Sequence, residues 1–262
     1  MKVEQLTGIR KMDQYPRWLP FAMVAIFAVN WAYLVATRPP WDGNSYLPGI
    51  LQPIQVIILM LIAAMSARLV LLSGTKNSLA LIGLGVVLDL VIGGTLLQLE
   101  VPLYLDTIGS VLVAVILGPS AGGLTATISQ GILSIMYPPA TIFYMINVVV
   151  GWAAGLFAKM GGFTTAFSVG LSGLVTGVLA GMSAAPLMAL GLGDAPIVNQ
   201  TNPEELLMKF YGIFFGALTS PGAISDVLDK ILVFGVVSLI ARWIAQRFHI
   251  HKPVFEYRSQ IS

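Results

Sequence analysis

Polar side chains lie inside three apolar segments of the sequence, where they could bind a ligand or an ion. Asp89 is about eight residues, or roughly 12 Å of helix, from the polar end of its segment. An acid at such a depth in lipid costs about 2.5–3.5 kcal/mol on insertion scales. We therefore predict that Asp89 contacts a ligand or ion, or else is an inward-facing acid that is hydrogen-bonded to a neighbouring helix or protonated.

Two amides, Gln130 and Asn147, flank the short turn at residues 137–140. Because that turn makes their segments neighbours, both amides could line one cavity, or they could form interhelical hydrogen bonds. Four tyrosines fall on the same predicted side of the membrane as the turn: Tyr104, Tyr137, Tyr144 and Tyr211. They could stack on a planar ligand, or they could belong to an interfacial aromatic belt.

The residues needed for several known chemistries are missing. The only histidines are His249 and His251, near the C-terminal end, and the chain has no cysteine. It has no P-loop, no HExxH motif and no pair of deep carboxylates. The sequence therefore predicts no catalytic residue, no metal site and no cofactor.

Composition indicates a membrane protein. Of the 262 residues, 56% are hydrophobic and only 10% are charged, and the mean hydropathy is +0.85. An average soluble domain has about 25% charged residues. This balance argues against a soluble enzyme and against a nucleic-acid-binding protein, and the net charge of +2 does not suggest a polyanionic partner.

The apolar runs predict an all-α polytopic fold with eight transmembrane helices, since about 20 apolar residues cross a bilayer. We interpret residues 206–220 as a re-entrant or surface helix on the outer face. The eight predicted spans are 18–37, 49–67, 78–97, 106–118, 120–136, 140–158, 163–190 and 227–246.

The positive charges predict the orientation. With the N-terminus in the cytoplasm, 11 lysines and arginines lie inside and 3 lie outside. Both termini are then cytoplasmic, and the longer, more polar loops lie outside. We therefore expect any binding site to open outward.

Gly173, Gly177 and Gly181 recur every four residues and so share one helix face. Such a face lets another backbone approach closely. It serves either internal packing or the docking of a partner subunit.

Several short motifs resemble a known family. They are Tyr104-Leu105-Asp106-Thr107-Ile108-Gly109-Ser110, Leu117-Gly118-Pro119, Gly122-Gly123 and Asp229-Lys230 near the start of the last span. In this order they resemble the substrate-binding S component of energy-coupling factor (ECF) transporters, a type of ABC importer. The resemblance covers about residues 78–248. It divides the chain into an N-terminal extension with two transmembrane helices (1–76), a six-helix membrane domain (77–248) and a cytoplasmic tail (249–262).

The resemblance implies a function. Such proteins sit in the plasma membrane of a bacterium or archaeon and capture a vitamin or related micronutrient from outside. They deliver it by docking on a membrane coupling subunit driven by two ATPase subunits. The resemblance adds the loop 98–104, with Glu100, as the roof of the site, and the outer stretch 199–229, with the adjoining Lys230, as a wall.

The implied substrate-binding residues are Asp89, Glu100, Tyr104, Gln130, Tyr144, Asn147, Tyr211, Asp229 and Lys230. Docking in the family uses an Ala-x-x-x-Ala pattern on the first family helix. Here Leu84 stands where the second alanine would fall. The implied docking residues are Ala80, Gly83 and Gly85, together with Gly173, Gly177 and Gly181.

Three other functions remain open on the sequence alone. A stand-alone secondary transporter would use Asp89 to couple an ion, although the chain has no convincing internal repeat. A ligand-sensing membrane module would need an output partner. A membrane enzyme would need catalytic residues that the sequence does not show.

Overall fold

The computed structural model describes residues 18–37, 76–99, 103–191 and 221–247, and these are helical apart from short connections. The bounds are α2 Leu19–Thr37, α4 Lys76–Gln98, α5 Ile108–Leu117, α6 Pro119–Met136, the 3₁₀ helix η1 Pro138–Phe143, α7 Tyr144–Lys159, α8 Ala166–Gly191 and α10 Pro221–Arg247. The described part of the chain contains no strand.

The predicted spans that fall in the described ranges are helices, with bounds shifted by a few residues. The largest difference is at α10, which begins at residue 221 and not at 227. Proline at a first helical position favours a helix start, whereas our prediction followed apolarity and began the span after the charge of Asp226. The predicted span 49–67 and the segment 206–220 lie outside the described residues.

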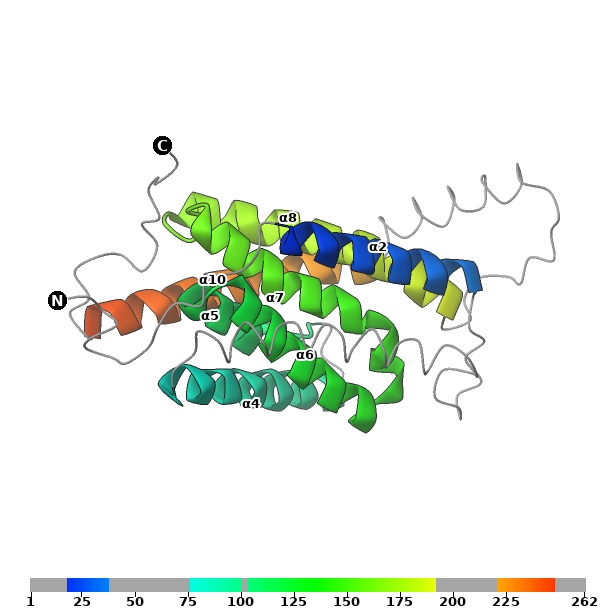
Figure 1. The fold of residues 1–262 in the computed structure, drawn as a ribbon, viewed down its shortest axis with the longest axis horizontal. Helices are drawn as coiled ribbons and strands as arrows, with labels where there is room; N and C mark the ends of the chain where they lie inside the picture. The colour runs from blue at the N-terminus through cyan, green and yellow to red at the C-terminus, as the bar shows by residue number, and fades with distance from the viewer. Residues whose placement is uncertain (1–17, 38–75, 100–102, 192–220, 248–262) are drawn as a thin grey trace.

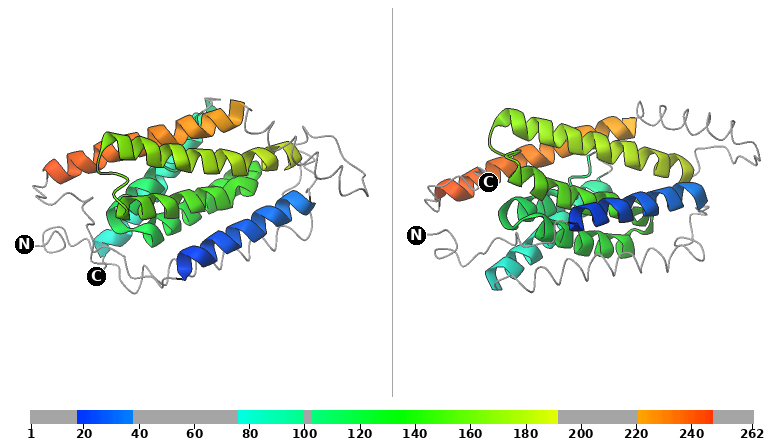
Figure 2. Two further views of the ribbon diagram at one scale, coloured as in Figure 1. Left: turned by 90° about the horizontal axis from the view of Figure 1, so that it is seen from above. Right: turned by 45° about the horizontal axis from the view of Figure 1, so that its top comes forward.

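The helices pack side by side into one elongated bundle (Figures 1 and 2). α8 runs along α10, and α6 pairs with α7. α4 lies against α5 and α6, while α2 lies on α7 and α8 on the other side of the bundle. α5 contacts α4, α6, α7 and α10, so the shortest of these α-helices is also the central one.

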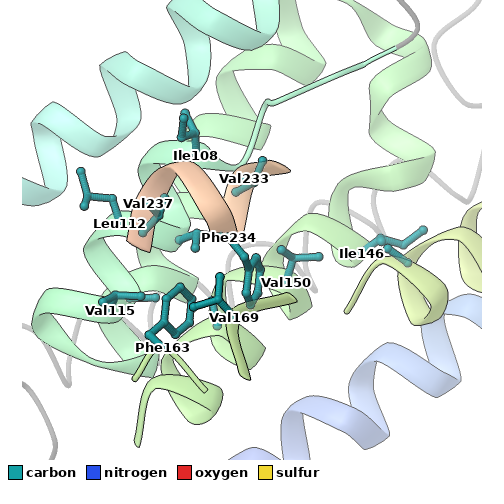
Figure 3. Packing of buried hydrophobic residues seen from close by; sticks show 14 of the residues in the cluster. Ile108, Leu112, Val115, Ile146, Val150, Phe163, Val169, Val233, Phe234 and Val237 are labelled. Atoms are coloured by element: carbon teal, nitrogen blue, oxygen red, sulfur yellow. The ribbon is translucent and has the colours of Figure 1, made fainter. Parts of the chain in front are cut away.

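The main core joins α5, α7, α8 and α10, as Figure 3 shows. Phe163, in the connection between α7 and α8, stacks on Phe234 of α10 with ring centroids 5.1 Å apart. Both side chains are fully buried. A stacked aromatic pair contributes about 0.5–1.5 kcal/mol beyond its buried area. This pair therefore fastens the α7–α8 connection to the last helix.

α2 shares this core with the helices of the predicted six-helix domain. Phe27 and Trp31 pack against the core cluster. The indole N–H of Trp31 donates a hydrogen bond of 2.8 Å to the backbone oxygen of Ser183 in α8. α2 is thus packed as part of the bundle, although it belongs to the segment that we predicted as an extension.

The Gly118-Pro119 turn separates α5 from α6, as its sequence predicts. Gly118 has φ 112°, a conformation that residues with a Cβ rarely adopt. Pro119 follows at the first position of α6, where its missing N–H costs nothing.

Glycines bring the helices into backbone contact, and this corrects part of the docking prediction. A Cβ at Gly173 would lie 2.9 Å from the Cα of Ile231, and one at Gly177 would lie 2.7 Å from the Cα of Val227. A Cβ at Gly85 would lie 2.6 Å from Val113 Cγ2. These three glycines therefore pack inside the chain and offer no free face to a partner. Gly181 is also buried.

Three described helical segments are long and apolar enough to cross a membrane: Lys76–Leu96, Ala140–Lys159 and Ala166–Ala184. Ile108–Leu117 is apolar but shorter.

We predict that Gly109→Ala strongly destabilises the protein, because a Cβ at Gly109 would collide with the backbone of Gly85. Repacking the α4–α5 contact should cost several kcal/mol, at least the ~1–3 kcal/mol typical of overpacking. The measurement is thermal unfolding in detergent. Gly235→Ala in α10 is the matched control, since no atom lies within 4 Å of its added Cβ. It should be neutral or stabilising by up to ~1 kcal/mol. Equal effects of the two substitutions would contradict the predicted close approach.

Candidate functional site

A polar cluster lies where the start of α5 meets α6, α7 and α10. We call it the Asp106 network. Its residues come from the α4–α5 connection and from three helices that surround it. The members are Asp106, Thr107, Gln130, Asn147, Asp229 and Lys230.

Asp106 is the hub of the network. Its Oδ2 accepts hydrogen bonds from Asn147 Nδ2 at 2.8 Å and from Gln130 Nε2 at 3.2 Å. Hydrogen bonds to an ionised acceptor are stronger than those between neutral groups. The two amides that the sequence singled out therefore meet, as their flanking of the short turn predicted, but they do so through a carboxylate from a third segment.

Lys230 joins the last helix to the hub. Its Nζ lies 2.6 Å from Asp229 Oδ2 and donates a hydrogen bond of 3.2 Å to Thr107 Oγ1. It lies 3.7 Å from Asp106 Oδ1. Lys230 and Asp229 are almost fully buried. Buried charges are tolerated where they are paired and hydrogen-bonded, and this arrangement satisfies that requirement for the lysine.

A strained backbone position lies directly beside the hub. Leu105 has φ 44°, in the left-handed region that non-glycine residues seldom adopt. Its N–H donates a hydrogen bond of 2.7 Å to Asp229 Oδ1. Such strain costs on the order of 1–3 kcal/mol and persists only where surrounding contacts enforce it. Asp229 therefore holds the turn that presents Asp106 to α6 and α7.

The electrostatic field in the α4–α5 connection is negative. Burial raises the pKa of Tyr104, and the carboxylates of Asp226, Asp106 and Asp229 raise it further against the opposing effect of Lys230. Negative charge outweighs positive charge at this phenol.

Asp89 belongs to a different, internal arrangement. Its Oδ1 accepts hydrogen bonds from the backbone N–H groups of Gly109 at 2.7 Å and Ser110 at 3.2 Å. Its Oδ2 accepts from the hydroxyls of Ser110 and Ser129, the latter at 3.0 Å. Thr107, the residue before α5, makes no side-chain capping bond. Asp89 thus caps α5 from α4, as the hydrogen-bonded alternative predicted.

The remaining predicted residues are scattered. Tyr104 is partly exposed beside the network, and Tyr144 is buried at the start of α7. Ala80 and Gly83 lie on an exposed face of α4. Glu100 and Tyr211 lie outside the described residues. Of the nine predicted binding residues, four belong to the Asp106 network: Gln130, Asn147, Asp229 and Lys230.

Three residues of the site were not predicted: Leu105, Asp106 and Thr107. Asp106 and Thr107 stood in the motif that carried the family resemblance, but we interpreted them only as the start of a helix. A carboxylate that directly precedes an apolar helix and follows Tyr104 was the available signal. The positive φ of Leu105 has no counterpart in the sequence.

Among the described residues, no group of three or more acidic or histidine side chains could hold a metal ion. The network instead brings the Asp106 carboxylate, two amides and a lysine together at the start of α5. Comparisons with protein families, curated proteins and solved structures give no match to this chain.

We predict that Asp89→Ala lowers the free energy of unfolding by about 2 kcal/mol or more, because it leaves two buried N–H groups and two hydroxyls without their acceptor. Asp89→Asn, which keeps one acceptor oxygen, should cost less. Unfolding of the purified protein in detergent measures both. If Asp89→Asn left stability unchanged but abolished ligand binding, the capping role would be contradicted.

Proposed function

We propose that this chain is the substrate-binding S component of an ECF-type importer. It captures a small water-soluble molecule, such as a vitamin or its precursor, from outside the cell. The observation that carries the proposal is the Asp106 network. It brings charged and amide side chains from the α4–α5 connection, α6, α7 and α10 to one place in the bundle.

The outer surfaces of the bundle support a place in the lipid bilayer. Large apolar side chains are exposed along α4 and α8, including Leu84, Val87, Val91, Leu171 and Leu179. Soluble proteins rarely expose contiguous apolar patches of this kind. We propose eight membrane-spanning helices in the plasma membrane of a bacterium or archaeon, with both termini in the cytoplasm.

The proposed mechanism needs binding and docking but no bond-making in this chain. The substrate binds at the Asp106 network, and the loaded protein docks on a coupling subunit that two ATPase subunits drive. The exposed face of α4 around Ala80 and Gly83 is the proposed docking face. The secondary-transporter alternative is less favoured, because the four hydrogen bonds to Asp89 are those of a helix cap.

We predict that Asn147→Leu weakens substrate binding about tenfold or more, since a hydrogen bond to a charged group contributes about 1.5–3 kcal/mol. A thermal-shift screen of the purified protein against water-soluble vitamins identifies the ligand, and titration then gives the affinity. The control is Thr95→Val, because this exposed hydroxyl bonds only the carbonyl of Val91 in its own helix. Unchanged affinity in Asn147→Leu, or the absence of any vitamin that binds, would count against the proposal.

We predict that Gly83→Leu prevents copurification with the coupling subunit and leaves stability and substrate binding intact. Gly83 is exposed, and a Cβ added there meets nothing within 4 Å outside the backbone of its own helix, so a leucine is expected to block close approach of a partner helix. Gly235→Leu is the control, because a Cβ added there also meets nothing within 4 Å outside its own helix backbone and Gly235 lies in α10. Retained copurification in both variants would place the docking surface elsewhere.

A further inference from the structure

The charges at the Asp106 network do not balance. Asp229 is fully buried and the side chain of Asp106 is 14% exposed, and Lys230 is the one cation that the described residues place beside these two carboxylates. Asp226 lies one helical turn before Lys230, and its carboxylate adds negative charge near Tyr104. An excess buried charge is costly unless a charge of opposite sign compensates it.

Lys230 does not satisfy Asp106. The ammonium is within 2.6 Å of Asp229 Oδ2 but 3.7 Å from Asp106 Oδ1. Asp106 Oδ1 is buried and accepts no hydrogen bond from the described residues. Asp106 Oδ2 therefore accepts hydrogen bonds from two side-chain amides, while Asp106 Oδ1 can still accept a hydrogen bond.

A buried tyrosine also lies on a helix that contributes to the network. The side chain of Tyr144 is 2% exposed, and its hydroxyl interacts with the side chain of Thr127. Tyr144 lies one turn before Asn147, so the two share a face of α7. Tyrosine rings attract cations through their faces. Tyr104, on the other side of Asp106 in sequence, stands in a negative field.

On the basis of the proposed function, we infer that the substrate carries a positively charged nitrogen that binds beside Asp106. A nitrogen that carries a hydrogen atom would donate a hydrogen bond to Asp106 Oδ1. An organic cation fits better than a metal ion, because the described residues hold no cluster of three metal-ligating acidic or histidine side chains. An anionic substrate would add to the uncompensated negative charge. The polar remainder of the molecule would lie near Gln130 and Asn147.

The test is equilibrium binding to the purified full-length protein, using molecules that differ in charge. Pyridoxamine and pyridoxine share one ring and differ by an ammonium group, so they form a matched pair. The further cations tested are thiamine and choline. The further neutral compounds are nicotinamide and riboflavin, and the anions are biotin and pantothenate. We expect at least one cation to bind about tenfold or more tightly than its neutral or anionic counterparts.

Two variants assign the charge preference to the site. Asp106→Asn should reduce the preference for the cation about tenfold. Asp226→Asn should reduce the preference for the cation several-fold. Because Asp226 is less buried than Asp229, this variant should fold, and it therefore tests the charge preference even where Asp106→Asn has a folding defect. Tighter binding of a neutral or anionic compound, an unchanged preference in both variants, or no binding of any cation overturns the inference.

Copurification with a coupling subunit is scored separately. If a neutral or anionic vitamin binds and the coupling subunit copurifies, the importer proposal stands and the inferred charge is wrong. If a cation binds but no coupling subunit copurifies, the importer proposal fails and the inferred charge stands.

Discussion

The carboxylate of Asp89 accepts hydrogen bonds from the first free N–H groups of α5, and much of the structure depends on this contact. The first turn of any helix has backbone donors without partners inside the helix. Here the partner comes from α4, and Ser129 of α6 binds the same carboxylate. The contact thereby fixes the start of the central helix against two neighbours. Because Asp106 and Thr107 directly precede that start, it also fixes the position of the Asp106 network.

Charge burial explains how such a site can exist in an apolar bundle. Amide donors from α6 and α7 and a lysine from α10 surround one carboxylate, so its desolvation is partly offset before any ligand arrives. The strained turn at Leu105 is part of the same arrangement. The Asp229 carboxylate accepts the hydrogen bond of the Leu105 N–H and also neutralises Lys230.

Hydropathy predicted the helices of the described ranges, because apolar runs and the Gly118-Pro119 turn are local features. It misplaced the start of α10, since charged residues there are buried by the fold. Gln130 and Asn147 were predicted because a short turn joins their segments. Asp106 was not, because its partners lie 24 to 124 residues away along the chain and no local pattern reveals them. The glycine stripe of α8 was ambiguous until α10 was seen against it.

The hydrogen bond between Trp31 and Ser183 has a consequence for biosynthesis. Its two residues are 152 positions apart, and ribosomes add about 5–20 residues per second. α2 is therefore complete about 8–30 s before the part of α8 that it binds. During that interval the indole lacks this acceptor. α2, the earliest helix among the described residues, therefore completes its packing on α8 late, and a nascent chain that stops before Ser183 leaves α2 without its α8 contacts while α7 is already present.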